Sequence, residues 1–123
     1  MVHATAARPE AVNELDQTLV ALADGTRRSA VDLLRRRPQR AGELAAALSL
    51  SPAAMSRHLR VLRRSGLVTE EGLDEDARVR VYRLRPERFS DLRQWLEGVE
   101  ASWAGELTAF KTHVERTRAK RRP

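Results

Sequence analysis

The residues best suited to bind another molecule lie between Ser51 and Val68, and four of them are arginines. No acidic residue interrupts this stretch. A guanidinium group is a planar fork of hydrogen-bond donors, so it can bind a phosphate or the edge of guanine with two bonds at once. The stretch therefore indicates a polyanionic partner, whose bases or phosphates these side chains would contact.

A helix is needed to position these arginines, and the sequence supplies its start, its buried side and its end. Ser51 can cap free backbone N–H groups, and Pro52 suits the first helical position. Gly66 is a typical helix stop. Apolar residues recur at spacings of four and three between these ends, at Met55, Leu59 and Leu62. We therefore expect a helix over residues 51–65 with an apolar back and a basic or small front.

The flanking sequence indicates that this helix belongs to a helix-turn-helix followed by a hairpin. Two short amphipathic helices joined by the turn at residues 49–51 would make the helix-turn-helix. Strands are predicted at 67–69 and 78–84, around a polar tip at 72–77, and this hairpin would be the wing of a winged helix. The other periodicities and breaks predict helices at residues 10–23, 26–36, 41–48 and 89–116.

The last predicted helix carries an apolar stripe that a chain of this size cannot bury alone. Both tryptophans of the chain lie on it. We predict that the stripe is a homodimer surface, packed with the first helix and with its symmetry mate, and the alternative is a helix folded back on its own core. The interface candidates are Leu15, Leu19, Leu92, Trp95, Leu96, Val99, Trp103, Leu107 and Phe110.

Length and composition bound the class of protein. The 123 residues suit one domain, and a formal net charge of +6 favours nucleic acid first and an anionic membrane surface second. The chain has no cysteine, which excludes disulfides and thiolate metal sites. No apolar run approaches a membrane span and the N-terminus lacks a signal-peptide core, so we expect a cytoplasmic location with no membrane partner.

Several motifs together resemble the ArsR/SmtB family of bacterial winged-helix repressors. They are Leu22 to Arg28, Glu43 to Ala45, Ser56 to Leu62 and Gly66 to Val68. The resemblance covers about residues 15–84 and is looser in the last helix. It implies a homodimer built from the first and last helices, which binds operator DNA through two recognition helices. The expected fold is mainly α with a small β-hairpin, a winged helix-turn-helix.

The sequence departs from the metal-sensing members of this family. The thiolate sensor motif would fall on residues 40–43, where its ligand positions are Arg40 and Gly42. The last-helix type of sensor needs paired ligands, and this helix offers His113 with Glu106 and Glu115 in no such pattern. We therefore expect no metal and no cofactor, and the resemblance is to members that act without metal.

The DNA-binding candidates follow from the expected helix and wing. A recognition helix reads bases mainly with its N-terminal half, whereas Arg60 sits one turn later, where a phosphate contact is expected. Wing arginines can enter the minor groove or remain surface charges. A base contact and a phosphate contact stay open for Arg57. The candidates are Ser51, Ala53, Ala54, Ser56, Arg57, Arg60, Arg78 and Arg80.

Other basic residues have structural interpretations. Arg27 and Arg28 start a helix, where an arginine is expected to pair with an acid or a helix end. His58 borders the apolar stripe, and a packed histidine is favoured over a base contact or a pH switch. The cluster at Arg35–Arg37 with Arg40 suits either a solvated face or the phosphate backbone.

The predicted organisation is a flexible tail at residues 1–9, one winged-helix domain at 10–117 and a basic tail at 118–123. Within the domain, residues 24–84 form the DNA-binding core and 88–117 the dimerisation helix. The predicted function is a homodimeric, sequence-specific repressor that binds an inverted-repeat operator through the helix at 51–65 and the wing at 67–84.

Three other functions compete with this one. A ligand- or metal-sensing repressor with a site at the dimer seam and a protein-docking module remain alternatives, and the small-molecule inducer is unknown. No enzyme is expected, since the chain lacks a glycine-rich phosphate loop, a Ser-His-Asp set in a plausible context and a carboxylate pair in a pocket-like setting.

Overall fold

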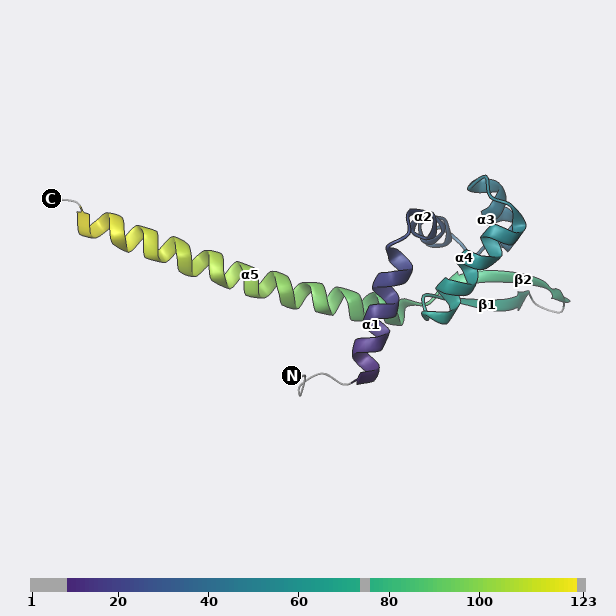
Figure 1. Cartoon of the computed structure of the whole chain (residues 1–123), viewed down its shortest axis with the longest axis horizontal. Coiled ribbons are helices and arrows are strands. Elements are labelled where there is room, and N and C mark those ends of the chain that lie inside the picture. The colour runs from purple at the N-terminus through teal and green to yellow at the C-terminus, as the bar shows by residue number, and fades with distance from the viewer. Residues whose placement is uncertain (1–8, 74–75, 122–123) are drawn as a thin grey trace. The chain divides into compact units, whose positions relative to one another are not determined.

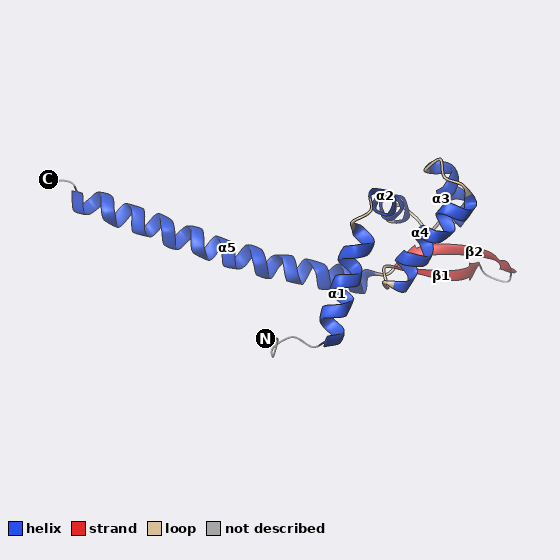
Figure 2. Ribbon diagram, in the orientation of Figure 1, coloured by secondary structure: helices blue, strands red, loops and turns tan. Residues whose placement is uncertain are grey.

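The computed structural model describes residues 9–73 and 76–121, and it confirms a mainly helical chain with one antiparallel hairpin (Figure 1). A run of helices comes first, then the two strands of the hairpin and then a last helix, which is the order expected from the sequence (Figure 2). The elements are α1 (Pro9–Leu22), α2 (Gly25–Leu34), α3 (Ala41–Ala47), α4 (Pro52–Arg64), β1 (Val68–Leu73), β2 (Asp76–Leu84) and α5 (Pro86–Arg121).

Contacts divide the chain into two compact units, residues 1–91 and 92–123, with the boundary inside α5. The first unit contains α1 to α4, the hairpin and the beginning of α5. The second unit is the remainder of α5. No helix in the described part of the chain has both the length and the apolar character that a bilayer crossing requires.

The core of the first unit is built around α4. Its stripe of Met55, Leu59 and Leu62 is at most 1% exposed, as the periodicity predicted. Helix α3 lies beside α4, and α4 rests on the hairpin (Figure 1). The other buried apolar residues are Ala21, Ala30, Leu34, Leu44, Ala45, Leu67 and Val68. Burial of the stripe fixes which side of α4 remains outside.

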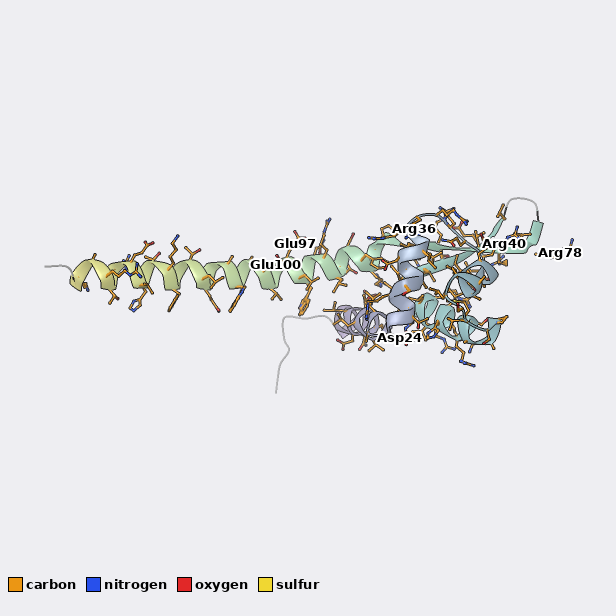
Figure 3. The ribbon with its side chains drawn as sticks, turned by 90° about the horizontal axis from the view of Figure 1, so that it is seen from above. Asp24, Arg36, Arg40, Arg78, Glu97 and Glu100 are labelled. Atoms are coloured by element: carbon orange, nitrogen blue, oxygen red, sulfur yellow. The ribbon has the colours of Figure 1, made fainter. Side chains whose placement is uncertain are left out.

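The junction of α1 and α2 is held by the arginines that the sequence assigned to structure. Asp24 lies where the two helices meet (Figure 3), and its side chain accepts a hydrogen bond from the Arg27 backbone N–H, which caps α2. The Arg27 side chain donates to the carbonyl of Ala21 at 2.7 Å, and Arg28 donates to that of Leu22 at 2.7 Å. These carbonyls end α1 and have no partner within the helix, so the two arginines stabilise that end.

The connection between α2 and α3 joins the edge of the hairpin. Gln39 and Tyr82 exchange two backbone hydrogen bonds, with N···O distances of 3.1 and 2.8 Å. The Gln39 side chain is buried and donates to the carbonyl of Leu33 at 2.7 Å. The segment between α2 and α3 therefore fixes β2 against the helices.

The hairpin follows a glycine whose backbone conformation is unfavourable for other residues. Gly66 has a φ of +80°, in the left-handed region that favours glycine, and it ends α4 as predicted. In the register that follows, Val68 pairs with Leu84 and Glu70 pairs with Tyr82. These four side chains share one face of the hairpin, since alternate residues of a strand point to the same side.

Three expected boundaries were wrong, each for a local reason. The strands run to Leu73 and from Asp76, because cross-strand ion pairs keep polar residues such as Glu71 and Arg83 in the ladder. Helix α5 extends over residues 86–121, because Pro86 suits a first helical turn and no glycine or proline follows Gly105 before Pro123. The basic tail expected at 118–123 is therefore helical through Arg121. The N-terminal tail expected at 1–9 lies outside the described residues except for Pro9.

Leu62→Ala should lower the free energy of unfolding by about 2–5 kcal/mol, because the side chain is fully buried and its loss leaves a cavity. Urea unfolding followed by circular dichroism measures the change. The matched control is Leu73→Ala, whose side chain is 39% exposed and should cost much less. Equal losses in the two variants would show that the α4 stripe is not the anchor of the core.

Candidate nucleic-acid interface

The outer face of α4 is the side left after the apolar stripe is buried. Ser51 caps this helix, since its hydroxyl oxygen accepts a hydrogen bond from the Ala54 N–H at 3.1 Å. Most of the residues predicted to bind DNA from α4 are exposed, and Ala54 is the exception because it is half-buried. The exposed ones are Ser51, Ala53, Ser56, Arg57 and Arg60.

Two arginines on this face have guanidinium groups that are available to bind another molecule. The guanidinium groups of Arg57 and Arg60 make no ion pair or hydrogen bond with any described residue of the chain, and both side chains are exposed. An exposed guanidinium without an internal partner can bind an external phosphate or base without first breaking a bond. This arrangement gives α4 a positively charged outer surface.

A carboxylate that the sequence interpretation missed joins α4 to the wing. Glu70 is bound by three donors: Arg63 from α4, Arg80 Nε at 2.9 Å and the Tyr82 hydroxyl at 3.1 Å. Its side chain is 19% exposed. The only available sequence signal was the hairpin register, which sets Glu70 opposite Tyr82 and diagonal to Arg80. The predicted wing contact Arg80 therefore already has an internal partner.

The charges of this cluster shift the titration of its members. The hydrogen bond from Arg80 is the largest cause holding the pKa of the Glu70 carboxyl below its usual value, with smaller effects from Tyr82 and Arg63. Burial, and then the hydrogen bond to Glu70, raises the pKa of the Tyr82 hydroxyl. The carboxylate is therefore ionised, and the hydroxyl protonated, at neutral pH.

The remaining wing candidate lies further out. Arg78 is exposed and lies near the outer end of the hairpin (Figure 3). On the opposite face of the ladder from Glu70, Arg83 pairs with Glu71 at 3.4 Å. Two acidic residues of the polar tip expected at 72–77, Asp74 and Glu75, lie outside the described residues.

The other basic residues divide between structure and solvent. His58 lies against the α1–α2 junction, with its Nδ1 3.4 Å from a guanidinium nitrogen of Arg27, which agrees with a packed role. Arg37 pairs with Glu43 at 3.1 Å, whereas Arg36, at the end of α2, has no partner among the described side chains (Figure 3). The second basic cluster is thus partly neutralised.

Metal ligands do not gather in the part of the chain that the structure describes. No group of three or more His, Asp or Glu side chains in these residues could hold an ion. His113 lines a shallow hollow on the second unit with Val114, Thr117 and Arg118. These neighbours offer no carboxylate to complete a site.

The Glu70 carboxyl should titrate below its ordinary pKa of 4.5. Because the folded-state pKa is the lower one, its contribution to stability is complete above the unfolded value and is lost as the pH falls through the folded value. Carboxyl-carbon NMR measures the midpoint. Arg80→Gln should move it up towards 4.5, whereas Arg83→Gln, which removes a partner of Glu71, should leave it in place. An unchanged midpoint in the Arg80 variant would contradict this account.

Comparison with known proteins agrees with this geometry. The family model described as "Bacterial regulatory protein, arsR family" matches residues 24–70, from the cap of α2 to β1. The chain is 39% identical over 100 residues to the HTH-type transcriptional regulator Rv2034 of Mycobacterium tuberculosis, covering 81% of this chain and 88% of that protein.

Solved structures extend the similarity to the fold. An ArsR-like transcriptional regulator from Rhodococcus sp. RHA1 superposes with a TM-score of 0.71 at 30% identity, over 84% of this chain and 94% of that one. A homodimeric winged helix-turn-helix DNA-binding domain from Mycobacterium bovis gives a TM-score of 0.61 at 21% identity, over 87% and 94% of the two chains, and supports the fold alone. The chain therefore belongs to the ArsR family of bacterial transcriptional regulators and carries a winged helix-turn-helix DNA-binding domain.

Proposed function

We propose that this regulator is a homodimeric repressor that recognises an inverted-repeat operator and works without a bound metal. The observation that carries the proposal is the outer face of α4, where Arg57 and Arg60 are exposed and have no partner among the described residues. Acidic residues are absent from the whole helix. Such a surface fits the major groove, where an α-helix reaches both bases and phosphates.

Base recognition and binding of the phosphate backbone are assigned to different halves of α4. Arg57 and the small residues before it occupy the N-terminal half, which approaches bases in helix-turn-helix proteins. Small side chains such as Ala53 allow that close approach and can contact a thymine methyl group. Arg60 lies one turn further, where the helix meets the phosphate backbone. Specificity is therefore assigned to the first half of the helix and general affinity to the second.

The second copy of the chain is assigned to the apolar stripe of α5. Trp95, Val99, Trp103 and Phe110 are between 49% and 66% exposed in the single chain. A contiguous apolar surface of this kind marks an interaction site, because soluble monomers expose few such patches. On α1, Leu19 is 41% exposed and Leu15 is half-buried, so both remain available to join the interface. The homodimeric Mycobacterium bovis domain supports this assignment by its likeness in fold.

Charge favours an antiparallel pairing of two α5 helices. The first half of the second unit carries Glu97, Glu100 and Glu106, and its second half is rich in arginine and lysine. Parallel pairing would set like charges together, whereas antiparallel pairing sets the acidic half against the basic half. In an antiparallel pair centred between residues 106 and 107, Trp103 faces Phe110 of the second copy. Val99 likewise faces Val114 of the second copy.

Metal independence is supported by the residues at the sensor positions. Arg40 and Gly42 occupy the ligand positions of the thiolate motif, and neither can replace a thiolate. The repressor role rests on the resemblance to repressors of this family. Operator symmetry follows from the dimer, because a two-fold protein binds two half-sites related by the same symmetry.

Footprinting on the DNA upstream of the protein's own gene tests the proposal directly. Two protected half-sites, separated by about one helical turn or a multiple of it, are expected. With about eight phosphate contacts for the dimer, log K should fall against log salt with a slope near −7. Protection that is absent at every salt concentration would refute DNA binding at this site.

Arg57→Ala should reduce the preference for operator over random DNA by about 1–3 kcal/mol for each half-site, because one bidentate base contact is lost in each. Arg64→Ala is the matched control: it removes the same charge from the same helix, but this residue lines a groove beside α1 with Val20 and Val61. Fluorescence anisotropy with both DNAs measures the preference. If Arg57→Ala weakens both DNAs equally, Arg57 contacts phosphate and does not read bases.

Trp103→Ala should convert the dimer to monomer at micromolar concentration, because a large aromatic anchor is removed from the centre of the stripe. Sedimentation equilibrium measures the mass, and operator affinity should fall with it. Thr108→Ala provides a control, since this residue lies on the same helix outside the apolar stripe. A Trp103→Ala protein that remains dimeric would place the interface elsewhere.

A further inference from the structure

A small polar hollow opens between α4 and the hairpin. It has a volume of about 180 Å³ and is lined by Ser56, Leu59, Arg60, Arg63 and Tyr82. Leu59 is buried and forms the apolar floor, while the other residues present polar groups to the opening. The hollow therefore combines a closed base with a positively charged rim.

The hydrogen-bonding capacity of this rim is that of an anion site. Arg60 has no partner among the described side chains, and the Ser56 hydroxyl is exposed. Arg63 uses one terminal nitrogen on Glu70, which leaves its other N–H groups available. The Tyr82 hydroxyl proton is directed to Glu70, so Tyr82 shapes the wall and is not counted as a donor.

Glu70 makes the site rigid without cancelling its charge. Its single carboxylate is shared by Arg63 and Arg80, and Arg60 adds a third positive charge nearby, so the balance stays positive. A guanidinium already held by a carboxylate loses less side-chain freedom when it binds an anion. Glu70 is thus a positioning residue that acts through Arg63.

We propose that this hollow is a seat for one phosphodiester group of the DNA backbone, bound by Ser56, Arg60 and Arg63. The inference rests on the proposed DNA-binding function and assigns one contact within it. The seat opens on the face of α4 that carries Arg57, so a strand whose bases meet Arg57 brings its phosphates to this side. We choose a phosphate of duplex DNA as the occupant. The hollow is shallow, and it lies between α4 and the hairpin, the two elements expected to flank the DNA backbone.

A scan of single neutral methylphosphonate groups along the operator tests the seat. In the wild-type protein, one position in each half-site should lower affinity about tenfold, since a hydrogen-bonded charge contact is lost. In Arg60→Ala the same substitution should cost clearly less, because one of the two charged partners of that phosphate is already missing. Arg64→Ala, one turn beyond Arg60, does not line the hollow and borders the groove beside α1 instead, so it should retain the full wild-type loss.

Salt dependence gives a second readout. Arg60→Ala should reduce the slope of log K against log salt by about 1.8 for the dimer, at about 0.9 for each phosphate contact. Ser56→Ala should weaken binding with little change in slope, because it removes a donor and no charge.

Two outcomes would overturn the inference, and they are distinguishable. If the wild-type protein does not bind DNA, the proposed function fails together with the seat. If it binds, but every methylphosphonate effect is as large in Arg60→Ala as in the wild-type protein, the seat alone is refuted. Inorganic phosphate that competes with operator at constant ionic strength for the wild-type protein, and not for Arg60→Ala, would support the seat.

Discussion

Burial of three apolar side chains on α4 is the constraint on which the rest of this structure depends. Met55, Leu59 and Leu62 occupy the centre of the core, and their removal from water is the main energetic reason for α4 to lie where it does. Since a helix has only one such face inside, the opposite face is fixed at the same time. The proposed binding surface is therefore a consequence of packing, and its arginines need no further interaction to point outward.

Polar contacts add to the apolar core in holding α4 against the neighbouring helices and the hairpin. Arg27 and Arg28 bind the end of α1, and His58 extends that contact to α4. Glu70 joins the far end of α4 to the hairpin through Arg63. Each contact lies at the margin of the core, where an arginine can bury its stem and keep its charge partly hydrated. The helix is thus held at its middle and near its C-terminal end by polar contacts, and from beneath by apolar ones.

The sequence was most informative where structure depends on neighbours along the chain. The α4 stripe, the Ser51 cap and the Gly66 stop were all predictable, because each follows from local spacing or backbone preference. The roles of Glu70 and Gln39 were not. Glu70 acquires its partners only after the hairpin takes its register with Tyr82, and Gln39 is buried because it pairs with the edge of β2. Both depend on contacts between elements that spacing alone does not encode.

The hairpin has open edges beyond the point where Gln39 covers β2, and unpaired strand edges are places where proteins stick to one another. Its strands alternate small and apolar residues with Glu71, Arg78, Arg80 and Arg83. Rows of charge along an edge make addition of a foreign strand unfavourable, because the charges would lose water and meet their like. The charged residues of the wing therefore add resistance to aggregation to the DNA contact proposed for Arg78 and Arg80. A wing made less basic would be expected to lose solubility as well as affinity.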